Sequence, residues 1–135
     1  MHTATTRWSA GAAFLLFATP ALADQACLDA WTADIQPIVN RCVSCHQNAA
    51  PAGGLSLQRG TAPANLIWVT AGQADMPYVT PGDPSQSYLW HKLAGTHVEA
   101  GGTGAQMPLG SKLGETELTA IEAWIVACNE PAPAQ

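Results

Sequence analysis

Charged side chains are scarce in this chain of 135 residues: they make up 11% of it, and bases are the rarer kind. Five Lys and Arg residues face ten Asp and Glu residues, which gives a formal net charge of −5 at pH 7. A nucleic-acid-binding surface needs clustered positive charge against the phosphates, so we expect no nucleic acid among the partners. The length leaves room for one ordinary domain, which excludes a large multidomain enzyme.

Long apolar runs are also missing, apart from one stretch near the N-terminus. That stretch is centred on residues 12–18 and is far shorter than the ~20 residues that cross a bilayer. Small side chains at Ala21 and Ala23 fit the positions that signal peptidase recognises. We therefore predict a signal peptide over residues 1–23, cleaved after Ala23, rather than an uncleaved anchor, and no stable membrane insertion after cleavage. Loss of Arg7 with this segment leaves four bases against ten acids.

Aromatic residues are few once this segment is set aside. Both phenylalanines, Phe14 and Phe17, fall within it, and residues 24–130 hold six aromatic side chains among many Ala and Gly residues. A domain of this size with so few large side chains has a thin core, which a buried cofactor would fill. Residues 131–135 alternate Pro and Ala before a final Gln, and we predict a short disordered tail there.

No Ser/His/Asp arrangement, phosphate-binding loop or carboxylate pair stands out in the sequence. What it does contain is Cys42-Val43-Ser44-Cys45-His46, which has the form Cys-x-x-Cys-His. Two thiols three residues apart on a helical turn can add to the two vinyl groups of one haem, and the histidine that follows can bind the iron. The motif therefore predicts one covalently bound haem c, attached through Cys42 and Cys45, with His46 as the proximal ligand.

Two other chemistries use similar cysteine spacing. A structural zinc site would need a second ligand pair, but the remaining cysteines, Cys27 and Cys128, are single and far apart. A thioredoxin-like dithiol would need a βαβ context and would not require His46. Export also favours haem, because haem is attached to such motifs outside the cytoplasm.

In its motifs and their order the chain resembles the class I c-type cytochromes, in particular the small bacterial monohaem cytochrome c domains. The resemblance covers nearly all of residues 24–130. Besides the haem motif it rests on five stretches, at residues 35–39, 52–57, 81–89, 106–109 and 121–125. It implies an all-α class I cytochrome c fold, with about four or five short helices wrapped around the haem, and a location in the periplasm.

Local patterns predict where the helices lie. Residues 26–40 carry apolar side chains at helical spacing, but Pro37 fits best near the start of a turn, so we expect two short helices before the motif. Asp83 is expected to cap a helix that begins at Pro84. A last helix is expected to begin near Gly114. Its buried stripe would consist of Leu118, Ile121, Trp124, Ile125 and Cys128.

The resemblance also implies a second axial ligand. Members of this family use a methionine on a loop about 60 residues after the histidine, and Met107 lies 61 residues after His46 in a Gly-rich stretch. The alternatives that the sequence leaves open are an unfilled sixth position and three other side chains, Met76, His91 and His97. The family further places a backbone carbonyl against the proximal histidine, and Pro51 is the expected acceptor.

In the same family the first and last helices cross each other. The resemblance therefore implies a disulfide between Cys27 and Cys128 that pins this crossing, and export to an oxidising compartment favours the bond. Free thiols or a redox-active pair are the alternatives.

The expected function follows from these ligands. If His46 and Met107 both bind the iron, no substrate reaches the metal, so the protein would be a single-electron carrier that works by outer-sphere transfer and not an enzyme. Its partners would be redox proteins, an electron donor and an electron acceptor, with a basic or polar docking patch that suits the acidic chain. The alternative is a haem enzyme or ligand-binding sensor with an open or labile sixth position.

Overall fold

The structure is a computed structural model that describes residues 21–128. Residues 1–20 of the predicted signal peptide and all of the predicted tail lie outside the described residues. The architecture of the described part is all-α, as the sequence predicts, and two isolated β-bridges, Ile67 with Val79 and Thr70 with Pro77, stand in place of strands. Over residues 21–128 no helix combines the length and the apolar character that crossing a membrane requires.

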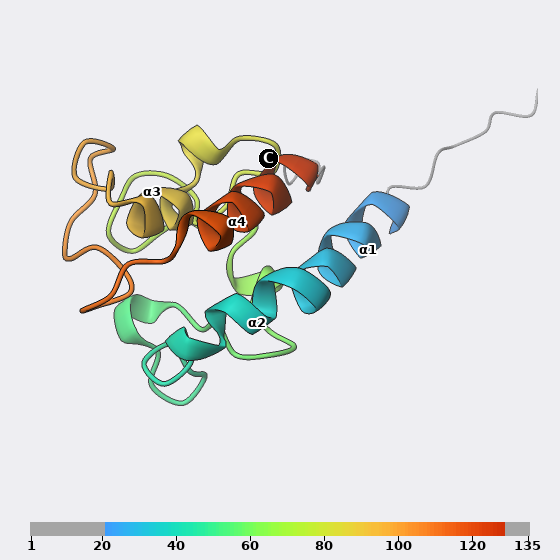
Figure 1. Cartoon of the computed structure of the whole chain (residues 1–135), viewed down its shortest axis with the longest axis horizontal. Helices are drawn as coiled ribbons and strands as arrows, with labels where there is room; N and C mark the ends of the chain where they lie inside the picture. Colours follow the sequence, from blue (N-terminus) through green and yellow to red (C-terminus); the bar gives the residue numbers. More distant parts are fainter. Residues whose placement is uncertain (1–20, 129–135) are drawn as a thin grey trace, which may run out of the picture.

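Three helical regions frame the molecule (Figure 1). The first is continuous and consists of α1 (Ala21–Ala30), a π-helical turn (Trp31–Ile35), α2 (Gln36–Val39) and a 3-10 turn (Asn40–Cys42). The second contains a 3-10 turn (Pro84–Gln86) and α3 (Tyr88–Ala94), and the third is α4 (Glu115–Ala127). Two further 3-10 turns, Ala52–Gly54 and Pro63–Asn65, lie in the long connection between them.

The two short helices expected before the motif form one continuous segment, with no break at Pro37. Proline lacks the backbone N–H that an α-helix uses, and the chain passes it by widening the preceding turn. The Gln36 N–H donates to the carbonyl of Trp31, five residues back, and normal α-helical bonding resumes when the Asn40 N–H donates to Gln36. The π-helical turn therefore replaces the predicted break, and the helix continues to the first cysteine of the motif.

The helix expected to begin at Pro84 is divided into a 3-10 turn and α3. Asp83 caps the 3-10 turn by accepting hydrogen bonds from the Ser85 and Gln86 N–H groups, and the Ser85 hydroxyl bond is the main cause that lowers the pKa of the Asp83 carboxyl. Ser87 is then extended, and α3 begins one residue later. The Tyr88 and Leu89 N–H groups donate to the carbonyls of residues 77 and 78, so this loop takes the place of a preceding helical turn.

The core lies where α4 crosses the first helical segment. Trp31 and Trp124 meet edge to face with their ring centroids 4.8 Å apart, and the Trp124 indole N–H donates to the Cys27 carbonyl at 3.1 Å. Of the stripe predicted for α4, Leu118 is half-buried and the rest is buried: Ile121, Trp124, Ile125 and Cys128. Helix α4 also begins where the sequence predicts, with the Gly114 N–H donating to the Glu117 carboxylate.

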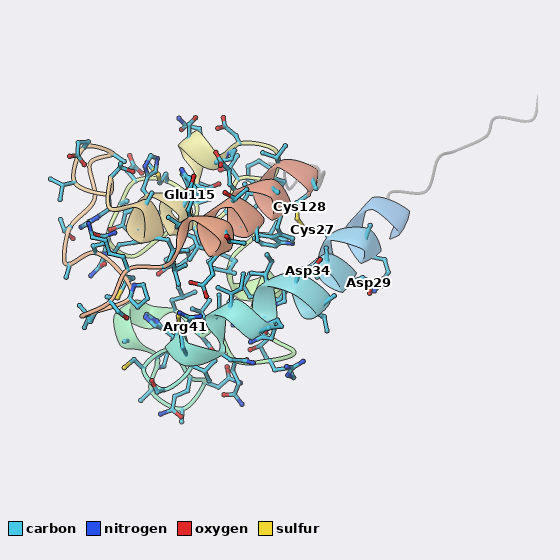
Figure 2. The ribbon with its side chains drawn as sticks, in the orientation of Figure 1. Cys27, Asp29, Asp34, Arg41, Glu115 and Cys128 are labelled. Atoms are coloured by element: carbon cyan, nitrogen blue, oxygen red, sulfur yellow. A yellow bond between two sulfur atoms is a disulfide. The ribbon has the colours of Figure 1, made fainter. Side chains whose placement is uncertain are left out.

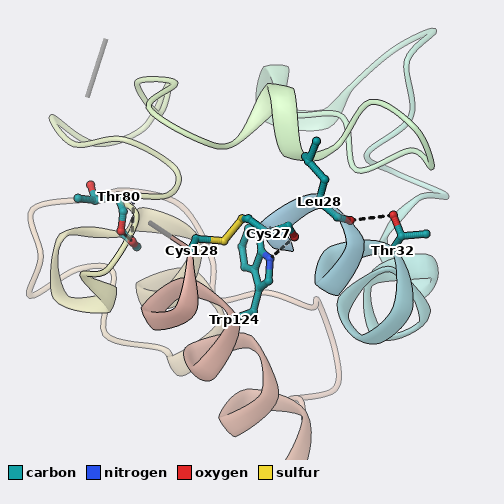
Figure 3. Close-up of a disulfide and its surroundings, with 7 residues drawn as sticks. Cys27, Leu28, Thr32, Thr80, Trp124 and Cys128 are labelled. Carbon is teal, nitrogen blue, oxygen red and sulfur yellow. Dashed lines mark hydrogen bonds between the residues drawn. A yellow bond between two sulfur atoms is a disulfide. The ribbon is translucent and has the colours of Figure 1, made fainter. Parts of the chain in front are cut away.

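A disulfide joins Cys27 to Cys128 at this crossing (Figure 3). Both cysteines are buried, and they lie 101 positions apart in the sequence. The bond ties the part of α1 nearest the core to the end of α4, as the resemblance implies.

Replacing both cysteines with serine is expected to lower the free energy of unfolding by about 4 kcal/mol, because closure of so long a loop removes entropy from the unfolded chain. The measurement is guanidinium unfolding of the haem-loaded protein with and without reductant. Reductant should destabilise the wild type and leave the double variant, C27S/C128S, unchanged. Equal unfolding midpoints for wild type and variant would contradict the prediction.

Candidate functional site

A cavity of about 370 Å³ lies between the end of the first helical segment, α3 and the loop that precedes α4. Its wall is mostly apolar and includes five leucines, of which four are buried: Leu55, Leu57, Leu89 and Leu93. The sequence singled out four residues for binding a cofactor, and all four line this cavity: Cys42, Cys45, His46 and Met107.

The first three of these residues are brought together by one turn of backbone. Cys42 ends the helical segment, and its carbonyl accepts hydrogen bonds from the Cys45 N–H at 3.2 Å and the His46 N–H at 2.9 Å. Both cysteines are free thiols, Cys42 half-buried and Cys45 exposed. Burial raises the pKa of the Cys42 thiol, against the opposing influence of the Arg41 guanidinium. The motif thus presents two thiols and one imidazole to the same space.

The His46 ring is fixed by a backbone carbonyl, but not by the expected one. Its Nδ1 lies 3.1 Å from the carbonyl oxygen of Leu55. The prediction of Pro51 was wrong because the Pro51 carbonyl accepts from the Gly54 N–H at 3.0 Å, within the 3-10 turn that follows the motif. The chain then extends, and the Leu57 N–H donates to the His46 carbonyl at 2.8 Å. With Nδ1 engaged, Nε2 is the ring nitrogen left for a metal.

Met107 reaches the cavity from the loop before α4. It is half-buried, and its N–H donates to the Lys92 carbonyl at 3.0 Å. The three other side chains considered for the same role do not line the cavity: Met76, His91 and His97. Both ring nitrogens of His91 are engaged, with the Thr96 hydroxyl and the Ser85 carbonyl, and the buried His97 places Nε2 2.9 Å from the Gly104 carbonyl. A ligand role for Met107 stays a prediction, which this placement favours.

Two tyrosines complete the wall and tie neighbouring loops together. The Tyr78 hydroxyl donates to the Gly53 carbonyl at 3.2 Å, and the Tyr88 hydroxyl donates to the Thr103 carbonyl at 3.0 Å. Their ring centroids lie 6.5 Å apart. Burial raises the pKa of Tyr88, so its hydroxyl remains a donor at neutral pH. Each tyrosine thereby holds a loop that borders the cavity.

Gly102 leaves the space that the Tyr88 ring fills. A Cβ atom at residue 102 would lie 2.3 Å from a Tyr88 ring carbon, far inside contact distance. We expect Gly102→Ala to lower the free energy of unfolding by roughly 1–3 kcal/mol, the usual cost of an overpacked site. The measurement is denaturant unfolding. Gly72→Ala is the matched control, since its Cβ would meet only the Gly53 carbonyl oxygen at 3.6 Å. Equal losses in the two variants would contradict this account.

Sequence reasoning missed Lys92, which is 8% exposed and lines the cavity. Its Nζ donates to the carbonyls of Thr103 at 2.8 Å and Ala105 at 2.7 Å, and burial lowers the pKa of the ammonium. One signal in the sequence could have found it. Lys92 lies one turn after the apolar pair formed by residues 88 and 89, on the face of α3 that is otherwise buried.

Few charged side chains line the cavity, and those that do are basic. No carboxylate is among the lining residues of this part of the chain, while Arg41 and Lys92 are. Arg41 forms an ion pair with Glu117 that links the end of the first helical segment to the first turn of α4. Figure 2 shows Arg41 at the motif end of that segment, with Asp29 and Asp34 further toward α1. Asp29 and Asp34 thus lie away from the cavity wall, whereas Glu117 pairs with Arg41, which lines it.

Two other polar side chains lie outside the cavity wall. Arg59 is exposed. The Trp68 indole N–H is buried and has no hydrogen-bond acceptor among the residues that the structure describes, and Trp68 has a positive φ of 56°.

Between residues 21 and 128, no three His, Cys, Asp or Glu side chains gather as a group that could hold a metal ion.

Comparison with known proteins gives one match. Residues 42–101 match a family model described as Planctomycete cytochrome C. The match begins at the first cysteine of the motif and ends before Met107. No significant match was found among the curated proteins or among the solved structures. The finding supports a cytochrome c-like domain.

Proposed function

We propose that this protein is a periplasmic monohaem c-type cytochrome that carries single electrons between redox partners. One haem c would be bound through Cys42 and Cys45, with His46 and Met107 as its axial ligands. The observation that carries the proposal is the convergence of two free thiols, an imidazole with one engaged nitrogen and a thioether on a single apolar cavity.

The residues present fit this cofactor by their chemistry. Two thiols at this spacing are what thioether attachment needs, and histidine with methionine is a ligand pair found in cytochromes c. The buried leucines around them make the cavity wall mostly apolar, and an apolar environment would limit the reorganisation that accompanies a change of charge. Iron bound in this way supplies a one-electron couple.

The protein's own residues would set how that couple behaves. The Leu55 carbonyl orients His46, and the Lys92 carbonyl holds the Met107 backbone. With both axial positions filled by side chains, no reactant would reach the metal, so transfer would be outer-sphere. A methionine ligand favours the reduced form relative to a second histidine, which predicts a comparatively high reduction potential.

Redox partners would dock where the cavity meets the surface. Leu109 lines the cavity and is 67% exposed, and Cys45, Ala52 and Gly53 are exposed lining residues. We propose a small, transient interface there, below about 1,200 Å². No carboxylate lines the cavity within residues 21–128, so the net negative charge would steer a basic or polar partner at long range rather than through contacts at this rim. Electron-transfer rates with the true partner should therefore fall as salt rises.

A redox titration with and without carbon monoxide tests the proposal. We expect a one-electron transition whose midpoint is the same in both atmospheres, because carbon monoxide has no free position on the reduced iron. A midpoint that rises under carbon monoxide would show an open or labile sixth position. The haem enzyme or sensor would then replace the electron carrier.

A further inference from the structure

Lys92 is unusual for a lysine on a short helix, because only 8% of the residue is exposed and its ammonium donates to backbone carbonyls. Buried ammonium groups need hydrogen-bond acceptors to offset lost hydration. Here the acceptors are two carbonyls of the loop that leads to Met107, at residues 103 and 105, and the Nζ also lies 5.7 Å from the centre of the Tyr88 ring. No carboxylate lines the cavity beside it within residues 21–128.

The same residue holds the loop at a third point. The Lys92 backbone carbonyl accepts the hydrogen bond from the Met107 N–H at 3.0 Å. The side chain and backbone of Lys92 therefore contact the loop at residues 103, 105 and 107. These are the residues that lead directly to the Met107 thioether. Helix α3 fixes the position of Lys92 itself, because Leu89 and Leu93 on the same helix are buried in the core.

Gly104, between residues 103 and 105, leaves room for the Lys92 ammonium to contact the loop. Gly104 has a φ of +79°, and a Cβ atom there would lie 3.2 Å from the Lys92 Nζ. The Gly104 carbonyl lies 2.9 Å from Nε2 of the buried His97. Three consecutive carbonyls, at residues 103, 104 and 105, thus each have a side-chain partner. These contacts hold the loop before Met107 on a defined path, although it has no secondary structure of its own.

From this arrangement we infer that Lys92 is a positioning residue that keeps Met107 in place as a ligand. The inference rests on the proposed function, because it concerns the closed sixth position. Without the ammonium, the Ala105 carbonyl would lose its side-chain partner and the Thr103 carbonyl would keep only the Tyr88 hydroxyl. The loop would therefore leave its path more often. The Met107 N–H bond, the Gln106 side chain and the contacts of Tyr88 and His97 at residues 103 and 104 would then hold the loop without the ammonium.

The test compares Lys92→Met with two controls, using haem-loaded protein. Methionine keeps most of the side-chain volume but donates no hydrogen bond. Lys112→Met is the matched control, because Lys112 is the exposed lysine near the same loop. The C27S/C128S variant controls for general loss of stability at a point remote from the loop. Each ferrous protein is titrated with carbon monoxide, and each ferric protein is examined for the near-infrared sulfur-to-iron band.

For Lys92→Met we expect the apparent carbon monoxide affinity to rise at least roughly tenfold over wild type, since losing even one bond to a charged donor raises the open population by that factor. The sulfur-to-iron band should weaken. Lys92→Arg, which keeps several N–H donors, should restore both properties toward wild type. Lys112→Met and C27S/C128S should match the wild type. If Lys92→Met does not mature, Lys92→Gln carries the same comparison, with an intermediate affinity expected.

The outcomes separate the two proposals. A wild type that binds carbon monoxide freely, or that lacks the band, would overturn the proposed function. A wild type with a closed site, together with a Lys92→Met or Lys92→Gln variant that equals it in band and affinity, would overturn the inference about Lys92 alone. A comparable rise in affinity in C27S/C128S would also overturn it, because the effect would then follow stability and not the loop.

Discussion

Replacing Cys42 and Cys45 with alanine together is expected to give a protein that loses all of its haem when it is denatured. Both thiols line the cavity and neither is engaged in a disulfide, so each is available to form one thioether. Without them the haem would be held only by its axial ligands and by apolar contacts, which unfolding removes. The measurement is the mass of the denatured chain, which should exceed the peptide mass by one haem in the wild type and equal it in the double variant.

Single variants and one control make this prediction sharper. Cys42→Ala and Cys45→Ala should each keep one thioether when they mature, and so keep the haem mass. Ser44→Ala changes one of the two residues between the cysteines without removing a thiol and should behave as the wild type. If the double variant, C42A/C45A, still carried the haem mass after denaturation, covalent attachment would have to lie elsewhere in the chain.

Met107→Ala is expected to open the sixth position completely. The ferrous variant should bind carbon monoxide stoichiometrically at neutral pH, at concentrations where the wild type stays almost entirely unbound, because alanine supplies no ligand. The ferric variant should lose the sulfur-to-iron band, and its reduction potential should fall with the loss of the thioether. Absorption spectra of both oxidation states, with and without carbon monoxide, measure these changes.

The chain offers a matched control for this substitution. Met76 is also followed by a proline and is also half-buried, but it packs at the edge of the core and does not line the cavity. Met76→Ala should therefore keep the band and remain closed to carbon monoxide. A result in which Met76→Ala loses the band while Met107→Ala keeps it would transfer the ligand role to Met76.

Sequence patterns predicted the fold where local chemistry and burial agree. Helix α4 has acidic residues at its start and a regular buried stripe, and both its beginning and its buried face lie where expected. The all-α class followed from the resemblance to the class I c-type cytochromes. The first helical segment was not predicted correctly, because a helix can accommodate the proline at residue 37 in two ways. It can break, or it can widen the preceding turn. The buried Trp31 and Ile35, packed toward α4, select the continuous one.

The site could be predicted as far as the motif determines it. Cys42, Cys45 and His46 share one turn of backbone, so their convergence follows from spacing alone. The carbonyl that fixes His46 depends on the path of the next ten residues, where a 3-10 turn takes up Pro51 and leaves Leu55 for the histidine. No residue preference signals that choice.

Lys92 escaped prediction for a different reason. A lysine is expected at the surface, and only the tertiary positions of the carbonyls at residues 103 and 105 make its burial possible. Those carbonyls belong to a loop whose sequence is mostly small residues. The contact between α3 and this loop is therefore a property of the folded chain that the periodicity of α3 hints at but does not determine.

The most direct test of the central claim, a haem closed on both faces by His46 and Met107, is an absorption spectrum of the purified ferric protein from the visible into the near infrared. The account predicts a coloured protein with the weak near-infrared band of a sulfur-to-iron bond. A colourless protein, or a coloured one without that band, would contradict it.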